Sequence, residues 1–335
     1  MTETRFIIVG QGIAGTMLGI ELEKRGIEDF IIIDNDHKAS SSMAAAGTIN
    51  PVTGRNYVKS WMFEDLKSNF IPTYSQLNNQ TSQNVLQLLP IIRSLHSVKE
   101  ENMWLSRMED EQYQEYLGFE SDIAEISQWI HKPQSYGIIR HAWQLNLRNL
   151  LPFFKSFWQS KEQLITDVFD FKAIQILKNQ IIYRDIKSEK IVFCEGHGVV
   201  NNPFFNHLPF DPVKGEALII HLKESFTTSL RDKIFITPIG NDLYWCGANY
   251  EWKYSDHKPS GEGYKFLKSH LDEILLQPYE IADHWAGIRP STKSRRPIVA
   301  KHEIHDHMFI FNGLGTKGSS LAPYFAGLIA DMILE

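Results

Sequence analysis

Residues 6–15 of this 335-residue chain read FIIVGQGIAG. The first four are apolar, as in a strand buried on both faces of a parallel sheet, and a glycine-rich turn follows them directly. Apolar positions in 16–25 suit a helix, and Gly26 is a typical helix stop. A second apolar strand, 30–33, ends at Asp34. The N-terminal sequence therefore predicts a strand–helix–strand unit that begins a parallel sheet.

The glycines of the first turn have the spacing G-x-G-x-x-G. Gly10 permits the tight turn, Gly12 lets the backbone approach a pyrophosphate, and Gly15 lets the helix pack close to the strand. The pyrophosphate would lie at the helix N-terminus. Asp34, 24 residues after Gly10, would accept hydrogen bonds from a ribose hydroxyl. This context predicts a dinucleotide-binding unit but does not distinguish FAD from NAD.

The rest of the chain alternates between helical and strand-like patterns. Residues 40–54 are small and turn-prone, which allows close approach of the backbone to a ligand. Helices are predicted at 61–83, at 143–158 with a break or kink at Pro152, at 264–276 and at 321–334. Strands are predicted at 180–185, 190–194, 217–222, 234–238, 243–246 and 308–311. The runs between 213 and 250 indicate an antiparallel sheet distinct from the parallel one.

Composition narrows the class of protein. Lys and Arg number 34 against 40 Asp and Glu, a net charge of −6 that argues against a nucleic-acid partner. Two cysteines, Cys194 and Cys246, cannot form a disulfide framework and favour a reduced, cytoplasmic protein. The uncharged run 6–20 is too short to span a bilayer and is interrupted by glycines. We therefore expect a soluble protein without a membrane partner; its oligomeric state stays open.

Two C-terminal segments add a more specific pattern. Residues 285–299 read WAGIRPSTKSRRPIV, and residues 311–322 read FNGLGTKGSSLA. Together with the N-terminal glycine motif, the 214–216 KGE step and the 247–248 GA pair, they occur in the order found in one family. Over nearly its whole length the chain resembles the D-amino-acid oxidase superfamily of FAD-dependent amine oxidoreductases, which includes glycine and sarcosine oxidases.

The resemblance implies an α/β fold with two interleaved domains. A Rossmann-like FAD-binding domain would be discontinuous, comprising residues 1–80, 132–205 and 280–335. An antiparallel-sheet substrate domain of α+β type would comprise residues 81–131 and 206–279. The cofactor site would then draw on both ends of the chain.

The resemblance also implies roles for residues of the catalytic site. Arg289 matches the arginine that holds the substrate carboxylate, a task that suits its planar, permanently charged fork. Residues 313–319 match a loop and helix N-terminus at the pyrimidine side of the flavin, where hydrogen-bond donors stabilise negative charge. Lys317 either adds a full charge there or is a solvated loop lysine. Tyr244 and Tyr250 fall in the sheet that would cover the substrate. Of these two tyrosines, Tyr250 is predicted to contact the substrate.

The residues expected to contact FAD come from both ends and the middle of the chain. They are Gly10, Gly12, Ile13, Ala14, Gly15, Asp34, Asn35, Ser41, Ser42, Ala46, Gly47, Val168, Gly196, Gly287, Arg289, Gly313, Gly315, Thr316, Lys317, Gly318 and Ser319. No cysteine lies near the C-terminal loop, so the flavin is expected to bind non-covalently.

Three features depart from this pattern or carry no role in it. Glu195 occupies a position where the family commonly has a small residue, and a carboxylate is unfavourable near a cofactor phosphate. The segment 302–307, HEIHDH, has metal-ligand residue types, but strand geometry would place its histidines on opposite faces, so no metal site is predicted. The basic cluster 293–296 is interpreted as a loop.

These observations predict an enzyme, an FAD-dependent amine oxidase or dehydrogenase. It would oxidise the C–N bond of a small amino acid or N-substituted amino acid to an imine by hydride transfer to the flavin. Three alternatives stay open. The first is the oxidase half of the tRNA wobble-uridine modification enzyme, because residues 313–323 of this chain resemble its flavin loop. The other two are a 2-hydroxyacid dehydrogenase and a flavoprotein module without catalysis. The net negative charge of the chain favours a free amino acid over tRNA as the substrate.

Overall fold

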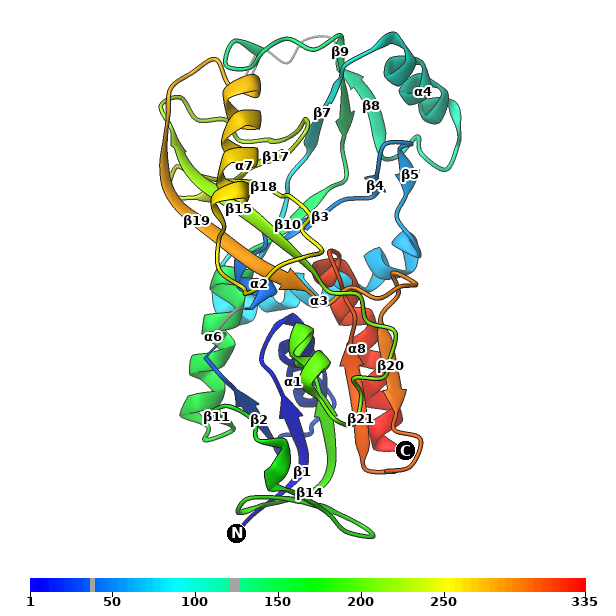
Figure 1. Ribbon diagram of the computed structural model, residues 1–335. Coiled ribbons are helices and arrows are strands. Elements are labelled where there is room, and N and C mark those ends of the chain that lie inside the picture. Colours follow the sequence, from blue (N-terminus) through cyan, green and yellow to red (C-terminus); the bar gives the residue numbers. More distant parts are fainter. Residues whose placement is uncertain (37–39, 121–126) are drawn as a thin grey trace.

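The computed structural model describes residues 1–36, 40–120 and 127–335. Two large sheets occupy the lower and upper halves of the view in Figure 1, with both chain termini at the lower end. The helices α1 (Ile13–Lys24) and α8 (Gly318–Leu334) accompany the lower sheet. In the described ranges, none of the helices has the length and apolar character needed to cross a membrane.

The central strands of the lower sheet are parallel, as expected from the N-terminal pattern, whereas its outer strands β12, β13 and β20 pair antiparallel. Its order is β11-β2-β1-β14-β13-β12, with β21 paired to β14 and β20 paired to β21. The strands are β1 (Thr2–Val9), β2 (Phe30–Asp34), β11 (Leu164–Thr166), β12 (Ile174–Ile176), β13 (Ile181–Tyr183), β14 (Ile186–Phe193), β20 (Ile298–Lys301) and β21 (Met308–Asn312). β1 runs parallel to β2 and β14. Its apolar residues are buried, which is typical of a parallel strand covered on both faces.

The upper sheet has the order β19-β15-β18-β17-β16-β7-β9-β8. Its strands are β7 (Ile91–Leu95), β8 (Leu117–Glu120), β9 (Ser135–Ile139), β15 (Val213–Leu222), β16 (Ser229–Arg231), β17 (Phe235–Gly240), β18 (Leu243–Gly247) and β19 (Tyr279–Arg289). It is antiparallel, as predicted, except that β16 and β7 run parallel. The helix α7 (Gly261–Ile274) buries one face, on which Leu218 and Ile220 pack with Leu267 and Leu271. Alternate residues of these strands point to the opposite face.

The remaining elements connect the two sheets or flank them. They are α2 (Ser41–Ala44), β3 (Thr48–Ile49), β4 (Val52–Thr53), β5 (Val58–Lys59), α3 (Phe63–Thr81), β6 (Leu86–Leu88), α4 (Val98–Glu109), β10 (Trp143–Leu145), α6 (Leu147–Ser160) and the 3₁₀ turns η1 (Phe171–Ala173) and η2 (Gly196–Asn201). The Tyr74 hydroxyl of α3 donates to the Ser319 carbonyl of α8 at 2.8 Å, which ties α3 to the C-terminal helix.

The helix predicted at 143–158 is partly wrong. Trp143 begins β10 instead, because it pairs with Ile49 of β3 and with Leu88 of β6. The helix α6 starts only after Asn146, whose side chain accepts the backbone N–H of residue 149 at 3.1 Å as an N-cap. It then continues through Pro152 without a break.

Two strands differ from the domain assignment drawn from the family resemblance. That assignment puts residues 132–205 and 280–335 in the cofactor domain, yet β9 pairs with β7, and β19 pairs with β15, in the upper sheet. We therefore propose boundaries after Ile139 and after Arg289. Residues 121–126 of the expected substrate segment 81–131 lie outside the described residues.

Candidate active site

The turn after β1 has the geometry that its three glycines predict. Gly10 has a φ of +98°, and a Cβ there would lie 2.6 Å from the Cys194 carbonyl oxygen. A Cβ on Gly15 would lie 1.9 Å from the Gly10 oxygen, so α1 packs directly on the turn. At Gly12 the nearest atom to such a Cβ is the Ser42 hydroxyl oxygen, at 3.4 Å. Two glycines thus serve the fold, and Gly12 leaves room beside the helix N-terminus.

The N-terminus of α1 supplies donors for an anion. No side chain caps it at Gly12, and the Ile13 N–H donates to the Ser42 hydroxyl at 3.1 Å. The first-turn N–H groups have no acceptors within the helix, and the helix dipole adds positive potential there. Asp34, at the end of β2, accepts the Gln11 N–H at 2.8 Å and is buried beside the turn. A pyrophosphate at the helix and a ribose at the carboxylate fit this set of groups.

The small-residue segment 41–47 is held between the two sheets. A Cβ on Gly287 of β19 would lie 3.0 Å from the Ser41 Cα, so α2 contacts the upper sheet at this glycine. The Trp245 indole N–H donates to the Ala44 carbonyl at 2.9 Å. The Gln144 amide donates to the Ala46 carbonyl at 3.1 Å and to the Pro238 carbonyl at 2.8 Å. Gly47, with a φ of +75°, fits where a Cβ would meet the Leu145 oxygen at 1.9 Å.

The C-terminal glycine loop brings a second helix N-terminus to the first. Gly313 and Gly315 have φ values of +77° and +55°, and α8 begins at Gly318, earlier than the predicted start at residue 321. A Cβ on Gly318 would lie 3.1 Å from Ile13 Cγ2, so the N-termini of α1 and α8 are neighbours. The Lys317 ammonium donates to the Ser60 hydroxyl at 3.1 Å. Burial lowers the pKa of Lys317, and the charge of Arg296 lowers it further.

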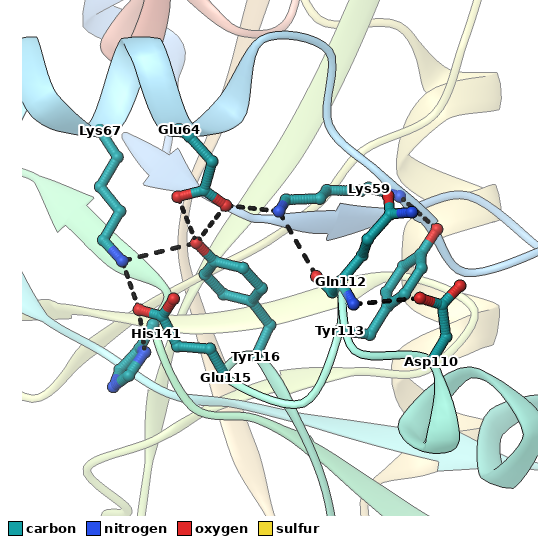
Figure 2. Close-up of polar contacts among 9 residues, drawn as sticks. All are labelled: Lys59, Glu64, Lys67, Asp110, Gln112, Tyr113, Glu115, Tyr116 and His141. Atoms are coloured by element: carbon teal, nitrogen blue, oxygen red, sulfur yellow. Dashed lines mark hydrogen bonds and ion pairs between the residues drawn. The ribbon is translucent and has the colours of Figure 1, made fainter.

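A polar network holds the segment that carries Ser60 (Figure 2). Its members are Lys59, Glu64, Lys67, Asp110, Gln112, Tyr113, Glu115, Tyr116 and His141. Glu64 of α3 lies between the Lys59 ammonium, with which it forms an ion pair, and the Tyr116 hydroxyl, which donates to it at 2.6 Å. Because Ser60 directly follows Lys59, this network helps to place the hydroxyl that binds Lys317.

Arg289 is the last residue of β19. Its guanidinium lies over Gly215, where a Cβ would come within 2.0 Å of Nη2. Its Nη1 and Nη2 atoms are 3.4 and 3.5 Å from the Asn249 carbonyl oxygen, and its Cζ is 4.6 Å from the centre of the Tyr250 ring. Burial lowers the pKa of Arg289. None of the carboxylates in the described ranges forms an ion pair with it.

Other predicted cofactor contacts occupy the ends of the lower sheet. Val168 is 64% exposed and follows β11, next to the β2 end: the Asp167 N–H donates to the Asp34 carbonyl at 2.9 Å. Asn35 is exposed beside it. Gly196, after β14, has a φ of +58°, and its carbonyl accepts the amide of Asn312 at 2.8 Å.

Further predicted residues belong to the helix N-termini already described. Ala14 is buried in the first turn of α1. Thr316 lies in the C-terminal glycine loop, immediately before Lys317. By contrast, the Tyr244 hydroxyl accepts the Phe226 N–H at 2.8 Å on the α7 side of the upper sheet, so Tyr244 belongs to the core there.

Glu195 is held beside the glycine turn. Its carboxylate accepts the Asn202 amide at 2.7 Å, and its Cα lies 3.3 Å from the position of a Cβ on Gly10. Burial raises the pKa of Glu195 to about 7, while the hydrogen bond from Asn202 lowers it by less. A protonated carboxyl group removes the like charge that a phosphate at the helix N-terminus would otherwise meet.

The stability of the protein should therefore depend on pH through Glu195. Its folded-state pKa, about 7, lies above the ordinary glutamate value of 4.5, so the folded state binds more protons between these values. The free energy of unfolding should fall by roughly 3 kcal/mol as the pH rises from 4.5 to 7, then level off. Denaturant titrations across this range measure it. The Glu195→Gln variant should lack this contribution, and identical pH profiles for the two proteins would contradict the assignment.

The histidines of the 302–307 segment lie in the turn between β20 and β21, not on a strand. The His302 Nδ1 accepts the N–H groups of Ile304 and His305, each at 3.1 Å, and its ring packs on Phe205. Within the described residues no three potential ligands gather into a metal site. His302 thus shapes the turn.

Several residues at the site carry no sequence motif. The Gln144 and Trp245 side chains bind the segment beside the predicted flavin position, and the Arg148 Nη1 atom is 3.5 Å from the Ala45 carbonyl oxygen. The Arg148 Cζ is 4.5 Å from the centre of the Trp285 ring. A polar residue within an apolar strand, as at Gln144, was the available signal, but only tertiary pairing shows what it binds.

Comparison with known proteins identifies relatives of this chain. The bifunctional protein ThiO/ThiG of Nostoc sp. is 25% identical over 361 residues, which cover 98% of this chain and 52% of that protein. The chain therefore spans about half the length of this relative. The glycine oxidase of Bacillus subtilis is 28% identical over 159 residues, covering 45% of this chain and 42% of that enzyme.

Solved structures share the fold. The crystal structure of glycine oxidase from Geobacillus kaustophilus superposes with a TM-score of 0.82 at 19% identity, covering 100% of this chain and 95% of that one. The family model described as DAO, FAD dependent oxidoreductase, matches residues 5–332. The glycine turn, the buried Asp34 and the paired helix N-termini are suited to the cofactor named in that description. The chain belongs to the DAO family of FAD-dependent oxidoreductases.

Proposed function

We propose that this enzyme oxidises the C–N bond of a small amino acid or N-substituted amino acid to an imine, with non-covalently bound FAD. FAD would be held by the glycine turn, Asp34 and the N-termini of α1 and α8, and when bound it supplies the hydride acceptor. Both cysteines are buried and unpaired, which supports non-covalent binding and a reducing compartment such as the cytoplasm.

One observation carries the proposal: the Arg289 guanidinium is half-buried without a carboxylate partner within the described ranges. A charge withdrawn from water is costly unless it is compensated, so the arrangement favours an anionic ligand that completes it. Among the described residues, Arg289 contacts the Asn249 backbone carbonyl and the face of Tyr250. A substrate carboxylate supplies two acceptor oxygens in the geometry of the guanidinium fork.

The chain's own residues then orient the substrate. Gly215 leaves the space that the Arg289 side chain fills, and Tyr250 lies against one face of the guanidinium. A carboxylate held here places the neighbouring Cα on the side of the sheet that also contacts α2 through Gly287. Fixing that geometry lowers the entropy cost of the hydride transfer. The nitrogen lone pair forms the C=N bond as the hydride leaves Cα, and water hydrolyses the imine.

Anaerobic bleaching of the flavin absorbance tests this function directly. The FAD-loaded protein is mixed with glycine, sarcosine, other amino acids, N-alkyl amino acids and 2-hydroxy acids. We expect loss of the flavin absorbance with amino or N-substituted amino acids and none with hydroxy acids. Bleaching by hydroxy acids alone, or by none of these compounds, would contradict the proposal. Salt-sensitive binding of tRNA together with oxidation only of a tRNA-borne side chain would favour the RNA substrate.

A further inference from the structure

Two arginines stand side by side on the upper sheet. Arg231 of β16 is the register partner of Arg93 of β7, so their side chains leave the same face of the sheet. Like charges in directly paired positions destabilise a sheet. Neither residue is exposed: both are half-buried, and the Nε atom of Arg93 is fully covered. Two half-buried arginines side by side are unfavourable unless a negative charge, from the protein or from a ligand, compensates them.

The surroundings provide little compensation. Arg231 Nη1 donates to the Lys233 carbonyl at 2.6 Å, and its Cζ lies 4.8 Å from the centre of the Phe235 ring. The Arg93 Cζ lies 5.7 Å from the centre of the Tyr57 ring. The Tyr57 hydroxyl and the Arg93 Nε are both buried. Burial raises the pKa of Tyr57, and the charge of Arg93 and a side-chain hydrogen bond with it oppose that shift. The arginines thus contact ring faces, one phenol and one backbone oxygen.

The neighbouring acid does not neutralise the pair. The Asp232 carboxylate, next in sequence, is 3.1 Å from the His96 Nε2 and accepts the Lys233 N–H at 2.7 Å. Its charge acts on Arg231 at a distance, and the charge of Arg93 opposes it. Burial lowers the pKa of Arg231 to about 10, the direction expected for a cation short of counter-charge. In the described part of the chain, no carboxylate forms an ion pair with Arg93 or Arg231.

The arginine pair faces the same side of the sheet as Arg289. A row of register partners runs across the sheet from Trp285 to Arg93, all on one face: Trp285, Ala217, Gly247, Phe235, Arg231 and Arg93. Arg289 follows Trp285 by four residues on β19 and so leaves this face too. The Tyr250 ring packs against Arg289. Arg289 and the arginine pair thus lie on one side of the same sheet.

We infer that Arg93 and Arg231 form a second anion subsite, which binds a carboxylate on the nitrogen substituent of the substrate. This inference rests on the proposed function, in which Arg289 binds the amino-acid carboxylate. The substrate class is then an N-(carboxyalkyl) amino acid, a dianion that spans the sheet face from Arg289 to the arginine pair. Such a ligand supplies the counter-charge that both sites lack.

A binding experiment tests the subsite apart from catalysis. The thermal midpoint of the FAD-loaded protein is measured with linear dicarboxylates from adipate to dodecanedioate, and with monocarboxylates of matching length. We expect one chain length of dicarboxylate to raise the midpoint more than its monocarboxylate. This difference should disappear in the Arg231→Met and Arg93→Met variants but persist in Arg55→Met, which removes an exposed arginine from the turn that carries Tyr57. Equal shifts for both acid classes in the wild type would overturn the inference.

Kinetics provide the second readout. The wild type should prefer an N-(carboxyalkyl)glycine over the N-alkylglycine of equal length by about ten-fold or more in kcat/KM, as expected for a charged hydrogen bond. The Arg231→Met variant should reduce this preference to near unity, through lost activity on the carboxyalkyl substrate. If no amine bleaches the flavin but the Arg231-dependent dicarboxylate shift remains, the proposed function fails and the subsite stands. If sarcosine is oxidised and the preference is absent, the subsite alone fails.

The thermal midpoint without ligand distinguishes a binding role of the arginine pair from a structural one. Removing one of two uncompensated like charges should leave the ligand-free midpoint of Arg231→Met unchanged or higher. A strongly lowered midpoint would show that the pair is structural and would overturn the inference. Inorganic phosphate and tRNA serve as competitors: an Arg231-dependent effect of these, without one of dicarboxylates, would overturn it as well.

Discussion

Replacing Glu216 with alanine should lower the free energy of unfolding by about 3–5 kcal/mol, the cost typical of breaking a buried ion pair. The Glu216 side chain is fully buried behind the substrate face. Its carboxylate is 3.0 Å from the Lys214 ammonium and 2.9 Å from the His284 Nε2, and it accepts the Ser260 hydroxyl at 2.8 Å. In the described part of the chain, the variant leaves the buried Lys214 charge with Glu251, 3.4 Å away, as its remaining ion-pair partner. Urea unfolding monitored by fluorescence measures the loss.

Two control variants define the origin of this effect. The double variant Lys214→Met/Glu216→Leu removes both charges and should recover most of the stability, because apolar replacements of a buried pair are often neutral. Removing the carboxylate of Glu3, which pairs with Lys187 at the surface, should change little. A Glu216→Ala variant as stable as the wild type would show that Lys214 and His284 do not depend on this carboxylate.

The second large effect is expected at Arg289. Replacing it with alanine should reduce kcat/KM for amino-acid substrates by a factor corresponding to about 2–5 kcal/mol, the cost of truncating one partner of a buried, hydrogen-bonded charge pair. The FAD content should change little, because the glycine turn, Asp34 and the N-termini of α1 and α8 still hold the cofactor in the variant. Stopped-flow reduction of the flavin, together with FAD released by denaturation, measures both quantities.

The Arg289→Lys variant tests geometry separately from charge. A lysine keeps the positive charge but lacks the planar fork, so it should recover only part of the activity. The Arg5→Met variant provides a control, since it removes an arginine of the lower sheet that pairs with Glu189 at the surface, and it should leave amino-acid oxidation unchanged. Wild-type kinetics for Arg289→Ala would refute the carboxylate-binding role and with it the proposed function.

Much of the fold could be predicted from local sequence. The turn at Gly10 and Gly15 depends on steric contacts within a few residues, so its glycine spacing indicates it directly. The apolar runs of β1 and β2 and the helix between them follow from periodicity for the same reason. Local rules failed at Trp143, where pairing with Ile49 and Leu88 outweighed a helical pattern.

Some features of the candidate site could likewise be expected from sequence, whereas others depend on the fold. The cofactor cradle was expected from its glycine motifs, and the role of Arg289 from the family resemblance, because each lies in a contiguous stretch of sequence. The contact of Arg289 with Tyr250 and Gly215, and the pairing of Arg93 with Arg231, join strands far apart in the chain. Strand register and sheet order place such side chains together, and these depend on the packing of the whole sheet rather than on any local segment. The sequence thus indicated an FAD enzyme, whereas only the tertiary structure brought out the arginine pair.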